Sequence, residues 1–147
     1  MKIYAENKKG RFNYEILDEY EAGIVLSGAE VKSIRDKKIS LKESFATLKK
    51  GEIFLTNTHI SPYKPANLEN YEPTQPRKLL LTKAEINKII GKLSGEGLTL
   101  IPLKIYDKNG KIKALIGLAR GKKKYDKREA IKKRDINRDL QKEIKLK

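Results

Sequence analysis

The stretch from residue 13 to residue 27 alternates between polar and apolar side chains, and this pattern limits the possible folds most. Six of its seven even positions are apolar or aromatic, with Asp18 as the exception, whereas the odd positions are mostly polar. A period of two is typical of a β-strand with one buried face. The run is long for a strand and contains Gly23, which favours a bend or bulge, as in a strand that curves round a small barrel.

Two capping boxes predict where helices begin. Ser27 with Glu30 opens a short helix that reaches Arg35, and Thr82 with Glu85 opens a longer one. The second helix has apolar residues at i, i+3, i+4 and i+7, which form one face: Ile86, Ile89, Ile90 and Leu93. Glycines at positions 95 and 97 end this helix.

Two hairpins complete the predicted elements. Residues 44–49 and 52–60 are predicted strands around Lys50-Gly51, and residues 98–106 and 111–119 flank a turn that contains Asn109-Gly110. Residues 61–78, between the hairpins, hold four of the five prolines. Proline fixes φ and removes a backbone donor, so we expect an irregular segment with a functional role or local disorder.

The order of elements predicts a mainly β fold. Five or six strands with two helices suggest a small antiparallel β-barrel of the oligonucleotide-binding type with flanking helices. An open sheet with helices on one face is the alternative. We expect one barrel domain over residues 1–120 and a basic C-terminal tail over residues 121–147.

The charge of the chain points to a polyanionic partner. The formal net charge is +15 for 147 residues, which favours RNA, DNA or an anionic membrane. A membrane fits least, because no apolar run approaches the roughly 20 residues that span a bilayer. The polar N-terminal residues do not resemble a signal peptide, and there is no cysteine. We therefore expect a cytoplasmic protein.

The tail concentrates this charge. Residues 121–147 contain 12 Lys or Arg residues and 5 Asp or Glu residues, a net charge of +7. Asp126 and Glu129 fit a capping box, but a polar helix with so thin an apolar stripe is marginal alone in water. Either the tail is a solvated, frayed basic segment, or it orders only on a polyanion.

The residues give little support to catalysis. His59 is the single histidine, which excludes a metal site with two histidine ligands, and its simplest role is that of a partly buried side chain bonded to backbone. Neither a phosphate-binding loop nor a dinucleotide fingerprint is present. Asp18 faces the apolar side of its predicted strand, and Glu19 and Glu21 alternate on the other, so the three carboxylates do not converge. We expect a protein without enzymatic activity, cofactor or metal.

Basic and aromatic residues favour RNA as the partner. Lysines and arginines occur throughout the predicted domain, and contacts between such residues and phosphates give affinity without sequence readout. Tyr63, Tyr71 and Tyr125 lie in the predicted loop or tail, where their rings can stack on bases.

Five segments, in order along nearly the whole chain, resemble the small protein B family. They are YEAGIVLSGAEVKSIR (residues 20–35), HISPY (59–63), PRKLLL (76–81), GLTLIPLKIY (97–106) and ARGKKKYDKRE (119–129). The resemblance implies an oligonucleotide-binding-like barrel that binds the tRNA-like end of transfer-messenger RNA. It further implies a factor of trans-translation, which enters stalled ribosomes with that RNA and elongation factor Tu and performs no covalent chemistry.

The resemblance also implies which residues bind RNA. Glu30 falls on the glutamate that the family uses toward RNA, Asn7 on an asparagine before the first strand, and Leu80 on a leucine run near the RNA. At Thr82 related sequences often have Asn or His, so a role as helix N-cap fits this residue better. With the basic positions and the family motifs, the predicted RNA-binding set is Asn7, Lys8, Glu30, Lys32, Ser33, Arg35, His59, Arg77 and Leu80.

In the family the tail is disordered in isolation and helical in the empty mRNA channel, next to ribosomal RNA of the decoding centre. The residues that match its motif are Gly121, Lys122, Lys123, Tyr125, Asp126, Lys127 and Arg128. Two rivals remain open: a ribosomal or ribosome-assembly protein that keeps its tail on ribosomal RNA, and an RNA-modifying enzyme or nuclease.

Overall fold

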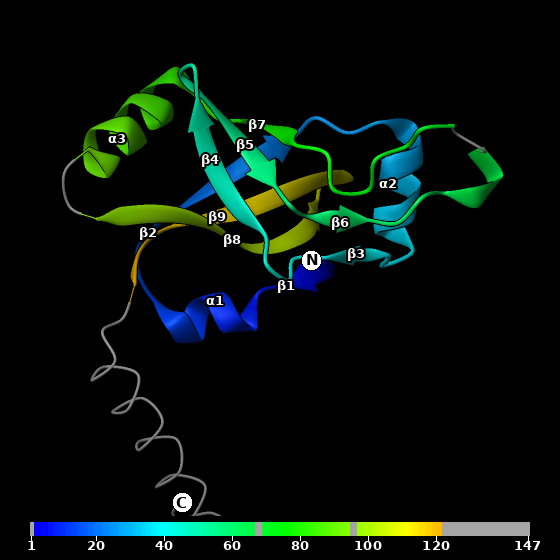
Figure 1. Cartoon of the computed structure of the whole chain (residues 1–147), viewed down its shortest axis with the longest axis horizontal. Coiled ribbons are helices and arrows are strands. Elements are labelled where there is room, and N and C mark those ends of the chain that lie inside the picture. The colour runs from blue at the N-terminus through cyan, green and yellow to red at the C-terminus, as the bar shows by residue number, and fades with distance from the viewer. Residues whose placement is uncertain (1, 67–68, 95–96, 122–147) are drawn as a thin grey trace, which may run out of the picture.

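Strands dominate the chain, as the sequence predicts. The computed structural model describes residues 2–66, 69–94 and 97–121. The strands are β1 (Ile3–Glu6), β2 (Tyr14–Ile24), β3 (Ile39–Ser40), β4 (Phe45–Lys49), β5 (Glu52–Thr56), β6 (His59–Ile60), β7 (Arg77–Leu80), β8 (Leu98–Lys108) and β9 (Lys111–Gly121). The helices are α1 (Lys8–Asn13), α2 (Gly28–Arg35) and α3 (Lys83–Leu93), with a short 3-10 helix at Lys64–Ala66 (Figure 1).

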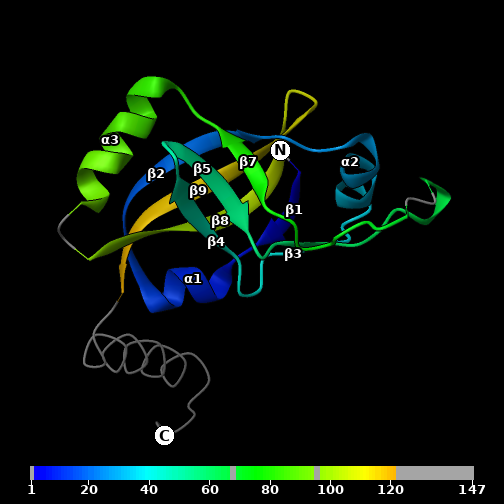
Figure 2. The ribbon, with the colours of Figure 1, turned by 45° about the horizontal axis from the view of Figure 1, so that its top comes forward.

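Six antiparallel strands close into a ring in the order β8-β4-β5-β7-β2-β9, because β9 pairs again with β8. β1 extends the sheet by pairing with β8, and β3 with β6 forms a separate two-stranded sheet. Two views show α2 and α3 on opposite sides of this ring (Figures 1 and 2). The open sheet with helices on one face, the alternative left by the sequence, is therefore wrong.

β2 contains a bulge, but it lies at Leu17 and not at Gly23. Ile16 is paired with Ala119 and Asp18 with Leu118, so Leu17 has no partner across the ladder. One extra residue moves all later even positions to the other face of the sheet. Gly23 keeps regular pairing with Leu80 of β7 and Lys113 of β9, since the strand needs no extra residue there.

The bulge explains why the sheet has apolar residues on both faces. Tyr20 and Ala22 face the main core inside the ring. Tyr14 and Ile16, before the bulge, pack against a second cluster around Ile101 and Leu103. That second cluster lies beside α1, whose Gly10 closely approaches the side chain of Ile101.

The helix starts follow the sequence closely. Both capping boxes are formed, with Ser27 and Thr82 as N-caps and Glu30 and Glu85 at N3. Ile89 is fully buried on the core face of α3. α1 and β1 were not predicted, because six and four residues are too few to show a period.

The two predicted hairpins are present, with left-handed backbone at Lys50-Gly51 and Asn109-Gly110, as two-residue turns require. The first hairpin is shorter than predicted, because a turn at residues 57–58 separates β6 from β5. No helix in the described parts of the chain is long and apolar enough to cross a membrane.

Candidate nucleic-acid interface

Glu30 and Arg77 form a buried ion pair between α2 and β7. The capping box directs the Glu30 carboxylate, because its Oε1 accepts the backbone N–H of Ser27 at 3.1 Å. Its Oε2 accepts hydrogen bonds from Arg77 Nη2 at 2.6 Å and from Arg77 Nε at 2.9 Å. The side chains of Glu30 and Arg77 are 4% and 2% exposed. Two charge-assisted bonds in a buried setting make this a rigid junction.

The junction also holds the end of the proline-rich segment. The hydroxyl of Tyr71 donates to Glu30 Oε2 at 3.1 Å, and Arg77 donates to the carbonyl oxygens of Pro73 at 2.9 Å and Thr58 at 2.6 Å. The segment is irregular, as predicted, yet its part from Tyr71 to Arg77 is fixed against α2. The hydroxyl of Tyr71 is engaged in this network, which leaves only its partly exposed ring for a base.

The electrostatics keep the junction charged near neutral pH. Burial by itself raises the pKa of the Glu30 carboxyl, but the hydrogen bond from Ser27 and the bonds and charge of Arg77 outweigh this effect. The pKa of Glu30 therefore lies below its ordinary value of 4.5. Burial, together with the negative charge of Glu30, raises the pKa of Tyr71 to about 12, so its hydroxyl stays protonated and can donate.

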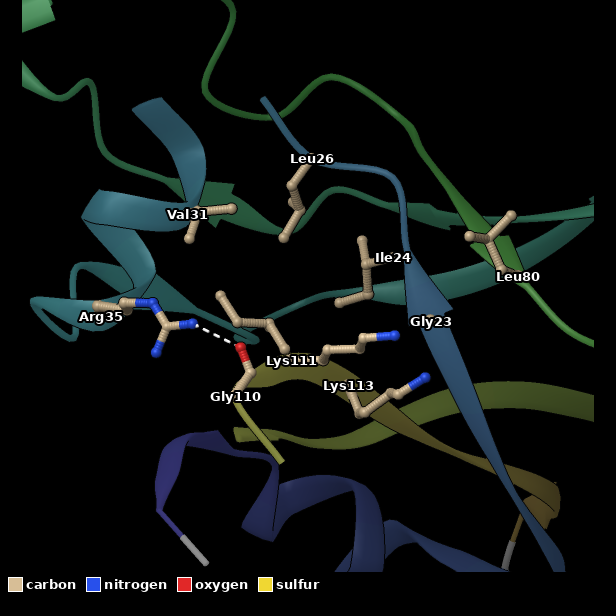
Figure 3. A pocket seen from close by; sticks show the side chains of 10 residues that line it. Gly23, Ile24, Leu26, Val31, Arg35, Leu80, Gly110, Lys111 and Lys113 are labelled. Atoms are coloured by element: carbon tan, nitrogen blue, oxygen red, sulfur yellow. Dashed lines mark hydrogen bonds between the residues drawn. The ribbon is translucent and has the colours of Figure 1, made fainter. Parts of the chain in front are cut away.

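A groove of about 370 Å³ opens where the ends of β2 and β7 meet α2 and the β8–β9 turn (Figure 3). Its apolar lining includes Ile24, Leu26, Val31 and Leu80. Leu80 is 52% exposed, which is unusual for a large apolar side chain and leaves it available for contact. Gly23 gives it room, because a Cβ at this position would lie only 3.3 Å from the Cβ of Leu80.

Three cationic side chains border the same groove: Arg35, Lys111 and Lys113. Arg35 is held in place, since it donates to the carbonyl oxygen of Gly110 at 2.9 Å and to the hydroxyl of Tyr4 at 3.1 Å, and it forms an ion pair with Asp107 at 3.4 Å. Figure 3 shows the ammonium groups of the two lysines pointing the same way, toward β2. An apolar floor with cations along one side suits the sugar, base and phosphate parts of a nucleotide.

The other predicted RNA-binding residues are spread around the domain. Lys32 places its ammonium 5.4 Å from the ring centroid of Tyr63. Asn7 is the N-cap of α1 and also donates to the carbonyl oxygen of Pro102 at 2.9 Å, while the following Lys8 is exposed. His59 is exposed in β6, so its expected partial burial is wrong.

Three predicted contacts are buried in this structure: Glu30, Ser33 and Arg77. Among the described residues, the Ser33 hydroxyl finds no hydrogen-bond partner. Arg77 cannot reach an external phosphate, because its guanidinium is enclosed by Glu30, Tyr71 and the carbonyls of Thr58 and Pro73. The geometry thus gives Glu30 and Arg77 a structural task, and direct contact of any predicted residue with RNA stays a prediction.

Sequence reasoning missed Lys111 and Lys113. They alternate with the buried residues of β9, and the Asn109-Gly110 turn sets which face they occupy, but their position beside Leu80 depends on pairing across three strands. Of the predicted tail residues, Gly121 ends β9, whereas Lys122, Lys123, Tyr125, Asp126, Lys127 and Arg128 lie outside the described residues.

The carboxylates considered for catalysis have separate partners. Asp18 accepts from the hydroxyl of Tyr20 at 2.9 Å, Glu19 from Arg11 at 3.2 Å, and Glu21 from the hydroxyl of Tyr106 and from Lys108. They do not converge on one point, as the alternation predicts. Within residues 2–66, 69–94 and 97–121 no group of three or more His, Cys, Asp or Glu residues is placed to hold a metal ion.

Comparison with known proteins then identifies the family. The model of a family described as SmpB protein matches residues 4–146. The chain belongs to the SmpB protein family. SmpB is the small protein B suggested by the five sequence motifs, so that resemblance is confirmed.

Similar proteins cover almost the whole chain. The SsrA-binding protein of Streptococcus mutans is 54% identical over 143 residues, which are 97% of this chain and 92% of that protein. The SsrA-binding protein of Lactococcus lactis subsp. lactis is 55% identical over 144 residues, 98% and 93% of the two chains. A chain from the solved structure described as "tmRNA-SmpB: a journey to the center of the bacterial ribosome" matches with a TM-score of 0.66 and 48% identity. It covers 86% of this chain and 92% of that one. This chain is therefore similar to SmpB proteins in both its sequence and its fold.

Proposed function

We propose that this protein binds the tRNA-like part of transfer-messenger RNA and acts with it in trans-translation, the rescue of stalled ribosomes. The observation that supports the proposal most is the groove at Leu80. In this SmpB-family chain it is lined by the exposed Leu80, by partly buried apolar side chains and by three cations. The names of its relatives, SsrA-binding proteins, and the ribosomal setting of the similar solved chain support the same conclusion.

The groove explains how binding works without chemistry. Lys111, Lys113 and Arg35 neutralise phosphates, which gives affinity without sequence readout. Leu80 packs against a ribose or base that approaches the apolar floor. Glu30 and Arg77 act as positioning residues, because their junction holds α2 and the proline-rich segment at the groove's side of the domain.

The finer parts of the proposal rest on the family. The closed ring of strands is an oligonucleotide-binding-like barrel, the protein is cytoplasmic, and it is not an enzyme. Elongation factor Tu joins the complex through the RNA. The tail over residues 121–147 binds ribosomal RNA in the empty mRNA channel. Domain boundaries at residues 1–120 and 121–147 belong to the same proposal.

The direct test is binding of the purified tRNA-like fragment by full-length protein, followed by a reconstituted tagging reaction on stalled ribosomes. Leu80→Ala and the double change of Lys111 and Lys113 to Ala should each weaken RNA binding and slow tagging. Leu17→Ala is the matched control, since Leu17 is also exposed on a strand but lies away from the groove. If the groove variants bind like the parent protein, the interface is misplaced.

Salt-washed ribosomes separate this role from that of a ribosomal or assembly protein. A rescue factor should wash off with high salt, because its binding is dominated by phosphate contacts and the complex is transient. Retention of the protein on washed ribosomes without transfer-messenger RNA would favour the ribosomal role. Cleavage or modification of the fragment by the purified protein would favour an enzyme.

A further inference from the structure

The outer face of β4, β5 and β7 carries a row of side chains that the groove does not explain. Ala46, Ile53, Leu55 and Leu79 point into the core. Their alternates on the same strands therefore point outward: Phe45 and Thr47 on β4, Phe54 and Thr56 on β5, and Lys78 and Leu80 on β7. Figure 1 shows β4 and β5 crossing in front of β8 and β9, and β7 is paired with β5 at their side.

Two phenylalanines flank a polar centre on this face. The register pairs Phe45 with Thr56 and Thr47 with Phe54. The hydroxyls of Thr47 and Thr56 lie 3.1 Å apart across the diagonal between the strands. The two rings therefore lie at opposite ends of a hydroxyl pair. Phe45 is 42% exposed, which is costly for an aromatic side chain without a partner.

The row is continuous with the groove. Phe54 is paired with Lys78 of β7. Lys78 and Leu80 are neighbours on the outer face of this strand, because Leu79 between them points into the core. At the other end, Phe45 lines a hollow of about 320 Å³ together with Lys9 and Asn13 of α1. A path thus leads from the Leu80 groove over Phe54 and Phe45 to α1.

Charges along the path suit a nucleic acid backbone. Lys78 lies beside Phe54, Lys49 is next on the outer face of β4, and Lys9 stands at the far hollow. Glu52 lies in the row and accepts a hydrogen bond from Lys78 at 3.1 Å, so these two charges compensate each other, and Lys49 and Lys9 supply the positive charge along the path. Glu43 also lines the far hollow. Aromatic rings with hydroxyls between them and lysines beside them are the composition of a surface that stacks unpaired bases.

We propose that this face, defined by Phe45, Thr47, Phe54 and Thr56, is a second RNA contact that stacks unpaired nucleotides of the same RNA molecule that the Leu80 groove binds. The inference rests on the proposed function, and continuity of the two surfaces is the reason for assigning both to one RNA. The rings give affinity for any base, since every base has a π-face, and the threonine hydroxyls reach base edges or ribose.

The test compares ring removal with ring retention in the full-length protein. Phe45→Leu and Phe54→Leu keep apolar bulk but lose the aromatic face, so each should weaken binding of the tRNA-like fragment at least fivefold. Phe45→Tyr and Phe54→Tyr keep the ring and should bind like the parent. Leu48→Ala is the control, because Leu48 is 39% exposed on the same strand as Phe45 but lies on the opposite face of the sheet.

Photocrosslinking of the unaltered protein gives a second measurement that does not depend on the variants' folding. The fragment, with 5-bromouracil in place of uracil at unpaired positions, should crosslink to tryptic peptides 43–49 and 51–77, which contain Phe45 and Phe54. Unchanged affinity of both Leu variants, while Leu80→Ala binds weakly, would overturn the second contact and leave the groove intact.

Two further results would also overturn it. If the Leu variants bind the fragment normally but associate poorly with ribosomes, the face contacts ribosomal RNA and not the RNA of the groove. If the parent protein does not bind the fragment at all, the proposed function fails, and the second contact fails with it.

Discussion

Glu30 uses its two carboxylate oxygens for different tasks. Oε1 accepts the backbone N–H of Ser27 and completes the local start of α2, whereas Oε2 accepts from Arg77 and Tyr71, which are 47 and 41 positions away. One side chain therefore joins the beginning of a helix to the end of a long segment. The capping role of Glu30 can be predicted from four consecutive residues. The ion pair cannot, because the sequence does not tell which of the many Lys and Arg residues lies next to Glu30 in the fold.

Removing Glu30 should cost far more than removing an ordinary capping glutamate. In Glu30→Ala the guanidinium of Arg77 stays buried without its partner, and we expect the free energy of unfolding to fall by about 3–5 kcal/mol. Glu85→Ala is the matched control, because Glu85 completes the same capping box in α3 with no buried arginine attached. It should cost about 1 kcal/mol. Urea unfolding followed by circular dichroism measures both, and equal losses would contradict the structural role of the ion pair.

The lowered pKa of Glu30 gives stability a dependence on pH. Its folded pKa lies below the ordinary 4.5, so the folded state binds fewer protons at this site than the unfolded state. The stabilisation is complete above the ordinary pKa and is lost as the pH falls through the folded pKa. The free energy of unfolding should therefore decrease on acidification below about pH 5.

Comparison with Glu30→Gln isolates this contribution. The pKa values of Asp18 and Glu21 are lowered as well, chiefly by hydrogen bonds from the hydroxyls of Tyr20 and Tyr106. Both carboxylates are present in Glu30→Gln too, so their contributions to the pH dependence are the same in the two proteins. The difference between the two proteins should shrink as the pH falls through the folded pKa of Glu30. A difference that stays constant between neutral and acidic pH would show that Glu30 does not titrate below its ordinary range.

At the scale of elements, local patterns predicted what depends on neighbours in the chain. The alternation of residues 13–27, both capping boxes and both two-residue turns correspond to β2, α2, α3 and the two hairpins. The bulge was placed at Gly23 but lies at Leu17, because a bulge is defined by the partner strand and not by the residue itself. Leu17 was nevertheless visible as an apolar residue at a polar position.

Gly23 serves close approach between β2 and β7. We expect Gly23→Ala to push Leu80 away, because the new Cβ would lie 3.3 Å from the Cβ of Leu80, tighter than ordinary contact. The displaced Leu80 should weaken binding of the tRNA-like fragment severalfold. Gly28→Ala is the control, since a Cβ at Gly28, in the first turn of α2, meets nothing within 4 Å. Equal affinity of the two variants, measured by fluorescence anisotropy, would exclude this role of Gly23.

At the scale of the whole molecule, the charge of +15 predicted a polyanionic partner but not the place of contact. Arg35 and Leu80 were predicted and do line the groove, together with Lys111 and Lys113, which were not. Arg77 was predicted as a phosphate contact and is enclosed. The sequence alone does not tell which basic side chains are exposed and which lie next to one another. Both properties depend on how the strands pair to close the ring.

The division of charge between domain and tail leads to the last prediction. Residues 121–147 hold a net +7, so a tail that served as an electrostatic anchor would contribute several phosphate contacts to the binding of free RNA. Each such contact steepens the dependence of log K on log salt by about 0.7–0.9. We expect instead that a chain ending at Gly121, where β9 ends, keeps most of its affinity for the tRNA-like fragment and nearly the same salt slope, because every residue that lines the groove lies before the tail.

Tagging on stalled ribosomes should nevertheless be lost in the truncated chain, since the proposed task of the tail is to order against ribosomal RNA, where polyanion contacts offset the cost of ordering. Tyr125→Ala in the full chain should slow tagging in the same way, because stacking of one base contributes about 1–3 kcal/mol. The charge-preserving control scrambles residues 122–128. If the scrambled chain supports normal tagging, the tail acts through its charge alone. If truncation reduces the salt dependence of free RNA binding by the equivalent of several phosphate contacts, the tail is an electrostatic anchor for the RNA, and the separate roles proposed for ring and tail are wrong.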